Sequence, residues 1–219
     1  MTGSNKKQQC PSGMRLWRDI REARKVSETL KKQDPRIWNH CFRVTALVTL
    51  MIPILDYRPS QIKGITEAAS FHDIGMLAIS AKIRNKGPLP ATAELLPHEY
   101  EVYKQHTVKG YEYIKQNKYL RHTLPAILYH HKKWDGSGYP EGLKGAEIPL
   151  TARIISVADE LDAMVNPGAG GTSYAMEWAL NSIRLRAGKD FDPHIVKALL
   201  KIGKQDIREV LNLFLRVRE

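Results

Sequence analysis

The sequence has few cysteines, no long apolar run and no secretory leader. Cys10 and Cys41 are its two cysteines among 219 residues, which excludes a disulfide framework and favours a reducing cytoplasm. The longest apolar stretch, Val44 to Leu55, is interrupted by two threonines and Pro53. It is too short to span a bilayer, and we interpret it as a buried helix. The first 13 residues lack the apolar core of a signal peptide.

A strand pattern is also missing, because no segment alternates apolar and polar residues over the length of a strand. Apolar residues recur instead at helical spacing, as in Val44, Leu47, Val48 and Met51. Asp34-Pro35 suits the start of that helix, with aspartate as the N-cap and proline in the first turn. We therefore predict an all-α fold. The other predicted helices cover residues 14–32, 59–73, 99–115, 124–133, 151–165, 174–187, 193–202 and 205–217.

Basic residues outnumber acidic ones, giving a net charge of +11 and a pI of about 9.6. Such a field favours anionic partners, although a scatter of solvated lysines explains the charge equally well. Arg15, Arg18, Arg21 and Lys25 share one face of the first predicted helix. No aromatic-rich RNA-binding run or zinc-finger spacing accompanies them, so nucleic acid is not a predicted partner. We predict a disordered segment 1–13, a basic helix 14–33, a main domain 34–203 and a C-terminal helix 204–219 packed on it.

Histidines and aspartates recur on or at the ends of the predicted core helices. A single histidine on an apolar face is usually a hydrogen-bonded core residue. Buried carboxylates are rarer, because burying an ionised carboxylate costs several kcal/mol unless it is paired or bound to a cation. Imidazole and carboxylate together suit iron, manganese or zinc, and a pair of such ions is typical of phosphoester hydrolysis. The residues that predict this centre are His40, His72, Asp73, His106, His130, His131 and Asp159.

An ordered series of motifs resembles the HD-GYP domains, a branch of the HD phosphohydrolases. His72-Asp73-Ile74-Gly75 is similar to the family's HD motif. His130-His131, followed by Asp135-Gly136-Ser137-Gly138-Tyr139-Pro140, is similar to its HHExxDGxGYP signature. The resemblance extends from about Asp34 to Leu200, through Ile148-Pro149-Leu150, Val157-Ala158-Asp159 with Asp162-Ala163, and Phe191-Asp192-Pro193.

The resemblance implies a helical bundle of the HD-domain type with a binuclear metal site at its centre. It implies hydrolysis of cyclic di-GMP, a bacterial second messenger, or a related nucleotide, to pGpG, GMP or both, by a hydroxide that bridges two ions. Iron or manganese is expected, with zinc as an alternative. Asp73 and His72 carry the implied catalytic roles. By the same resemblance, His40, His72, Asp73 and Asp159 hold one ion, and Asp73, His106, His130 and His131 hold the second.

Four departures from the family pattern concern metal or phosphate handling. Met76 occupies the place of a lysine that resembles a phosphate-charge stabiliser, and its alternative role is to fill the core. Arg36 replaces the glutamate of three-metal members, which predicts two ions. Lys132 replaces a glutamate that can orient an imidazole, although a solvated cation at a helix end is the simpler interpretation. The glycine-rich stretch 166–173 replaces a segment with phosphate-binding basic side chains, or is an ordinary flexible turn.

These departures leave two hypotheses for function. The first is a phosphodiesterase, whose activity the changes could reduce. The second is a weakly active or inactive docking module that binds a nucleotide or a diguanylate cyclase partner of the GGDEF type. In either case the substrate or partner loop is predicted to consist of Asp135, Gly136, Gly138, Tyr139 and Pro140.

Overall fold

The computed structural model describes residues 12–57, 59–86, 95–166 and 173–212. Within these ranges the chain is helical and contains no β-strand, only the isolated bridges Lys132–Gly138 and Ala187–Phe191. The predicted all-α fold is confirmed. Residues 1–11 of the predicted disordered segment and most of the glycine-rich stretch 166–173 lie outside the described residues. Ser12 and Gly13, predicted to be disordered, are instead the first residues of a helix. No helix in the described ranges is long and apolar enough to cross a membrane.

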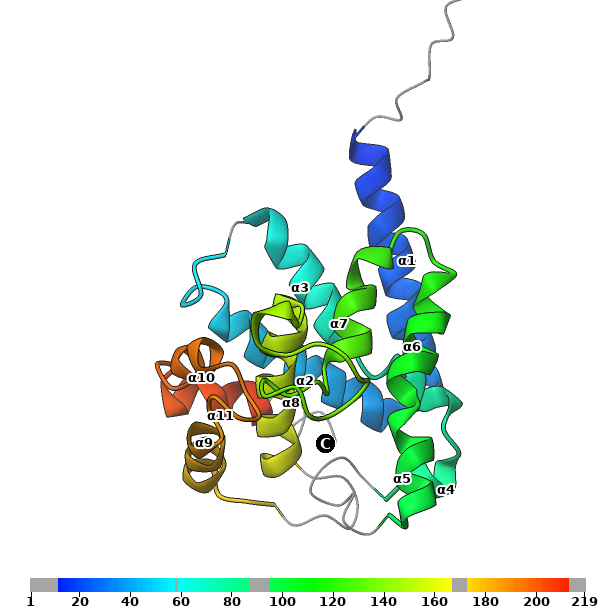
Figure 1. Ribbon diagram of the computed structural model, residues 1–219. Helices are drawn as coiled ribbons and strands as arrows, with labels where there is room; N and C mark the ends of the chain where they lie inside the picture. The colour runs from blue at the N-terminus through cyan, green and yellow to red at the C-terminus, as the bar shows by residue number, and fades with distance from the viewer. Residues whose placement is uncertain (1–11, 58, 87–94, 167–172, 213–219) are drawn as a thin grey trace, which may run out of the picture.

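The first two helices meet at the predicted Asp34-Pro35 boundary. Helix α1 covers Ser12–Gln33 and α2 covers Pro35–Met51. The Asp34 carboxylate accepts a hydrogen bond from the Arg36 backbone amide at 3.1 Å, as an N-cap should. Figure 1 shows the first turns of α1 extending beyond the other helices. The second half of α1 packs into the bundle through Val26 and Leu30, and the proposed domain boundary at residue 34 stays a prediction.

Two predicted helices are shorter than the sequence pattern suggested. The single helix predicted for residues 99–115 is wrong, because the chain forms α5, Pro97–Lys104, and α6, His106–Lys115, on either side of Gln105. The Gln105 amide donates to the Val102 carbonyl and closes a tight turn, and α6 begins at the next residue, His106. Helix α7 covers only Leu124–Tyr129 and does not reach residue 133. The residues after α7 bond to the following loop instead: the Lys133 amide donates to the Ser137 carbonyl at 3.0 Å.

The remaining elements follow the predicted order with shifted ends. Helix α3, Pro59–Phe71, is followed by the short η1, Ile74–Ala78, and α4, Ala81–Arg84. The last four helices begin close to where the apolar periodicity placed them. The other elements are η3 Arg121–Thr123, η4 Gly145–Glu147, α8 Leu150–Val165, α9 Met176–Leu185, α10 Pro193–Leu199 and α11 Lys204–Asn212.

Two apolar clusters form the core, and α2 contributes to both. One cluster joins Val44 and Leu47 of α2 to α8 and to α9, α10 and α11. The other joins Ile37 and Cys41 of α2 to α1, η1 and the helices α5 to α7. Figure 1 accordingly shows α2 and α8 in the middle, with α9 to α11 on one side and α4 to α6 on the other. Helices α2 and α8 therefore hold their polar residues where the two halves of the core meet.

Candidate metal centre

The seven predicted ligand residues come from five parts of the chain and lie together. His40 is on α2, His72 and Asp73 follow α3, and His106 is the first residue of α6. His130 and His131 follow α7, and Asp159 is on α8. His72, His106 and His130 are fully buried, and the others are at most 13% exposed at the side chain.

Two groups of these side chains could each hold a metal ion, and Asp73 belongs to both. His40, His72 and Asp73 form the first, and Asp73, His106, His130 and His131 form the second. Asp159 lies beside both groups, with one carboxylate oxygen 3.0 Å from His40 Nε2 and the other 3.9 Å from His131 Nδ1. This is the arrangement that the resemblance implied, while the role of each residue stays a prediction.

The hydrogen bonds of the histidines fix which ring nitrogen faces the centre. His72 Nδ1 lies 2.8 Å from the Ala69 carbonyl oxygen, and His130 Nδ1 lies 2.8 Å from that of Ile127. His106 Nδ1 lies 2.7 Å from the Tyr103 carbonyl oxygen. A carbonyl oxygen can only accept, so each Nδ1 must donate, and the neutral ring then presents an unprotonated Nε2.

The Nε2 atoms of these rings and of His40 face one another in pairs. His106 Nε2 and His130 Nε2 are 3.3 Å apart, and His72 Nε2 and His40 Nε2 are also 3.3 Å apart. Two lone pairs at that distance repel each other unless a cation or a proton lies between them. Asp73 Oδ1, buried beside the first pair at 3.3 Å from His106 Nε2, has no hydrogen-bond partner among the described residues. Nitrogen and carboxylate donors in this arrangement fit divalent transition metals.

The electrostatics keep the potential ligands in their metal-binding protonation states. Burial lowers the pKa of His106 to about 4 and the pKa of His131 well below its usual value. Burial opposes ionisation of Asp73, but His72 and neighbouring histidines hold the pKa of that carboxyl well below its usual range. His40 differs: burial disfavours its charge, but hydrogen bonds to Asp159 and Asp162 raise its pKa to about 10. A metal ion would replace the proton on His40 Nε2.

The glycine-rich loop after His131 packs its tyrosine against the centre. The Tyr139 ring lies 5.0 Å from the His131 ring and 6.1 Å from the His106 ring, between centroids. Gly138 has φ +78°, and a Cβ on it would lie 2.3 Å from the His131 carbonyl oxygen. The loop therefore approaches the His131 backbone so closely that only glycine fits there. Asp135 is exposed and bonds to Ser137 at the outer end of the loop.

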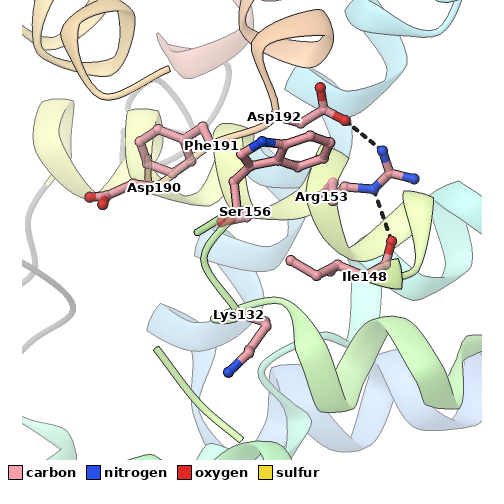
Figure 2. A pocket seen from close by; sticks show the side chains of 8 residues that line it. Lys132, Ile148, Arg153, Ser156, Asp190, Phe191 and Asp192 are labelled. Atoms are coloured by element: carbon pink, nitrogen blue, oxygen red, sulfur yellow. Dashed lines mark hydrogen bonds and ion pairs between the residues drawn. The ribbon is translucent and has the colours of Figure 1, made fainter. Parts of the chain in front are cut away.

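A small pocket lies on the other side of this loop, against α8 and the start of α10 (Figure 2). The Arg153 guanidinium pairs with Asp192 at 2.5 Å and donates to the Ile148 carbonyl oxygen at 2.9 Å. Its guanidinium carbon is 5.6 Å from the centre of the Trp134 ring. The Trp134 amide bonds in turn to the Asp190 carbonyl at 3.0 Å. These contacts anchor the loop to the rest of the bundle.

Three of the four departures can be placed in the structure. Met76 is 4% exposed and packs in the second apolar cluster, so it fills the core as its alternative interpretation held. Arg36 pairs with Asp34 at 2.9 Å and bonds to Asn85 at 2.6 Å, and it belongs to neither potential metal group. Lys132 is only 3% exposed. The simpler interpretation, a solvated cation at a helix end, is therefore wrong. Figure 2 shows its ammonium group pointing away from the Arg153–Asp192 pair.

One polar residue of the centre received no role in the sequence analysis. Asp162 is fully buried, and its Oδ2 lies 2.7 Å from His40 Nδ1. The Arg43 Nε donates to the Asp162 Oδ1 at 2.6 Å. The argument that singled out Asp159, an acid within an apolar helix, applies equally to Asp162 three residues later.

Comparison with known proteins places the chain among related sequences. The family model described as HD domain matches residues 24–195. A cyclic di-GMP phosphodiesterase of Thermotoga maritima is 39% identical over 140 residues, 63% of this chain and 37% of the relative. The cyclic di-GMP phosphodiesterase response regulator RpfG of Xanthomonas campestris pv. campestris is 33% identical over 174 residues, 78% of this chain and 44% of the relative. The chain thus spans less than half of either relative.

The fold also matches a solved structure, Bd1817, an HDG"Y"P protein from Bdellovibrio bacteriovorus. The TM-score is 0.61 at 18% sequence identity, with 73% of this chain and 50% of the other chain covered. At that identity the likeness concerns the fold alone.

Proposed function

The chain belongs to the HD domain family, in its HD-GYP branch, and on this premise we propose that it is a metal-dependent phosphodiesterase. Its proposed substrate is cyclic di-GMP or a related nucleotide, cleaved to pGpG, GMP or both. Two relatives are named as cyclic di-GMP phosphodiesterases, which supports this substrate class. The single observation that carries the proposal is the pair of facing imidazole nitrogens on each side of Asp73.

Each ion position would draw its ligands from several helices. His40, His72, Asp73 and Asp159 would hold one ion. Asp73, with one oxygen toward each group, would also serve the second ion together with His106, His130 and His131. Iron or manganese is the expected metal, with zinc as the alternative, and Arg36 supplies no ligand for a third ion. When bound, such a pair would activate a water molecule and neutralise phosphoryl oxygens.

The protein's own residues orient the site for the proposed ions. The carbonyl groups of Ala69, Tyr103 and Ile127 hold three imidazole rings with Nε2 toward the centre, so no reorganisation is needed when a ligand arrives. Of the catalytic pair proposed from the sequence, Asp73 belongs to both groups and His72 to the first. Tyr139 packs near the His131 and His106 rings on the loop side of the centre.

The buried Met76 side chain gives the site no positive charge at the position where the family has lysine. Removing one electrostatic group of this kind lowers the rate by about 10²–10³-fold. We therefore propose a slow enzyme. Slow turnover is also expected from the second hypothesis, a weakly active docking module for a nucleotide or a GGDEF-type partner. The names of the relatives favour catalysis, and a purely docking role does not require the facing imidazole pairs.

The test is to purify the full chain without chelators and quantify iron, manganese and zinc per chain. Cleavage of cyclic di-GMP is then followed by chromatography after anaerobic reconstitution with each metal, with cyclic GMP-AMP as the related nucleotide. We expect two ions per chain and slow formation of pGpG or GMP. Asp73→Asn should lose both metal and activity. The matched control Asp206→Asn, on the exposed face of α11, should lose neither. Absence of metal in every preparation would refute the proposal, and metal without turnover would favour the docking module.

A further inference from the structure

Asp162 is a buried carboxylate on α8 that the proposed ligand set does not use. Its side chain is 0% exposed, and its two oxygens are surrounded by donors. Arg43 donates from Nε at 2.6 Å and from Nη2 at 2.9 Å, and Asn166 donates from Nδ2 at 3.1 Å. His40 donates from Nδ1 at 2.7 Å, since an ionised carboxylate can only accept. With four donors in place, Asp162 is occupied by protein contacts and is not free to bind an ion.

His40 differs from His72, His106 and His130 in what fixes its ring. The Nδ1 atoms of His72, His106 and His130 donate to backbone carbonyls three residues earlier in the chain. Those rings are oriented by their own local backbone. The ring of His40 is oriented instead by a side chain 122 residues away, on another helix. The position that His40 shares with His72, Asp73 and Asp159 therefore depends on the packing of α2 against α8.

We propose that Asp162 is a positioning residue for His40. By accepting from Nδ1 it fixes the imidazole with Nε2 toward the centre and makes that nitrogen a stronger donor to an ion. Arg43 donates two further hydrogen bonds to the same carboxylate and so joins α2 to α8. The inference rests on the proposed metal centre, and it predicts that the two ion positions differ. The position that includes His40 is the one that should depend on Asp162.

The competing explanation is that Asp162 only ties α8 to α2 through its ion pair with Arg43. Two variants separate these explanations. Asp162→Asn keeps the size of the side chain but removes the charge that His40 Nδ1 contacts. Arg43→Gln breaks the same ion pair between the helices and leaves the His40–Asp162 contact intact. A merely structural role predicts the same metal content for both variants, whereas a positioning role predicts a difference.

The experiment measures metal per chain and affinity for Mn²⁺ in wild type and both variants. Asp162→Asn should weaken the affinity for one of the two ions by about 10- to 100-fold and leave the affinity for the other unchanged. Arg43→Gln should retain both ions. A second measurement uses ¹⁵N-histidine-labelled, metal-free protein. Wild type and Arg43→Gln should show the Nδ1–H resonance of His40 shifted downfield by the Asp162 carboxylate. Asp162→Asn should move that resonance upfield.

Equal metal content in wild type and Asp162→Asn, with an unmoved His40 resonance, would overturn the inference. So would an equal loss of metal in both variants. If wild type itself bound no metal, the proposed function would fail, and the His40 resonance would still decide whether Asp162 holds the ring. If Asp162→Asn did not fold, the wild-type resonance alone would serve, and its absence from the downfield region would refute the positioning role.

Discussion

Gly75→Ala should damage both the fold and the metal centre, because Gly75 is where η1 meets α6. A Cβ on Gly75 would lie 1.9 Å from the His106 carbonyl oxygen and 2.4 Å from the Gly110 amide nitrogen. Since real Cβ atoms keep at least about 3 Å from such atoms, the two elements would have to separate by about 1 Å. Both atoms belong to backbone, so no rotation of a side chain can relieve the clash.

The expected magnitude follows from that displacement. Overpacking a core costs about 1–3 kcal/mol, and a backbone clash belongs at the upper end, about 3 kcal/mol. For a chain of this size that corresponds to a decrease in Tm of about 6–12 °C. The same displacement would separate His106 Nε2 from Asp73 Oδ1, now 3.3 Å apart. Metal sites tolerate errors of only about 0.5 Å, so the ion held by His106 should be lost.

Thermal unfolding by circular dichroism and metal analysis per chain test both parts. The control is Gly64→Ala on α3, where a Cβ would only touch the His122 ring at 3.4 Å. That change removes a flexible residue from a helix and should stabilise the protein by about 0.5–1 kcal/mol without altering metal content. A Gly75→Ala protein with unchanged Tm and both ions would refute the packing argument.

Three further changes have defined outcomes. Asp34→Asn should lower stability by about 1–3 kcal/mol at pH 7, because it removes the charge that accepts two hydrogen bonds from the Arg36 guanidinium. Burial opposes ionisation of Asp34, but these bonds outweigh it and lower the pKa of Asp34 from 3.8. That contribution is present above pH 3.8 and disappears as the pH falls through the pKa of Asp34 in the folded protein. The free energies of unfolding of the two proteins, from denaturant titrations, should therefore converge in acid. A difference that stayed constant with pH would contradict this. Met76→Lys should raise kcat for cyclic di-GMP by about 10-fold or more, whereas Met76→Leu should not; equal rates would refute the missing-charge explanation. Lys132 is 3% exposed and forms no ion pair with the described residues, so Lys132→Met should raise the free energy of unfolding by about 1 kcal/mol. A large loss of stability would show that its charge is used.

The parts of the fold predicted from sequence were those fixed by local chemistry. Asp34-Pro35 specified the start of α2 because an N-cap and a first-turn proline act within a few residues. The break at Gln105 was not predictable in this way, because the periodicity of residues 99–115 continues across it. Tertiary packing decides that break: Gly75 contacts α6 at the His106 carbonyl and fixes where that helix runs.

The centre shows the same division between local and remote causes. Buried carboxylates and histidines in apolar helices identified the seven residues that the structure brings together. Asp162 was missed as a partner of His40 because the contact joins residues on two different helices, and one sequence does not reveal such pairs. The burial of Lys132 was also missed, because its place at the end of a predicted helix suggested a solvated cation favoured by the helix dipole.

The most direct test of the binuclear centre is anomalous X-ray diffraction from crystals of the protein purified without chelators. The account predicts two metal peaks bridged by Asp73. One should lie among His40, His72, Asp73 and Asp159, and the other among Asp73, His106, His130 and His131. No peak within these groups, or a single peak that leaves one facing imidazole pair empty, would contradict it.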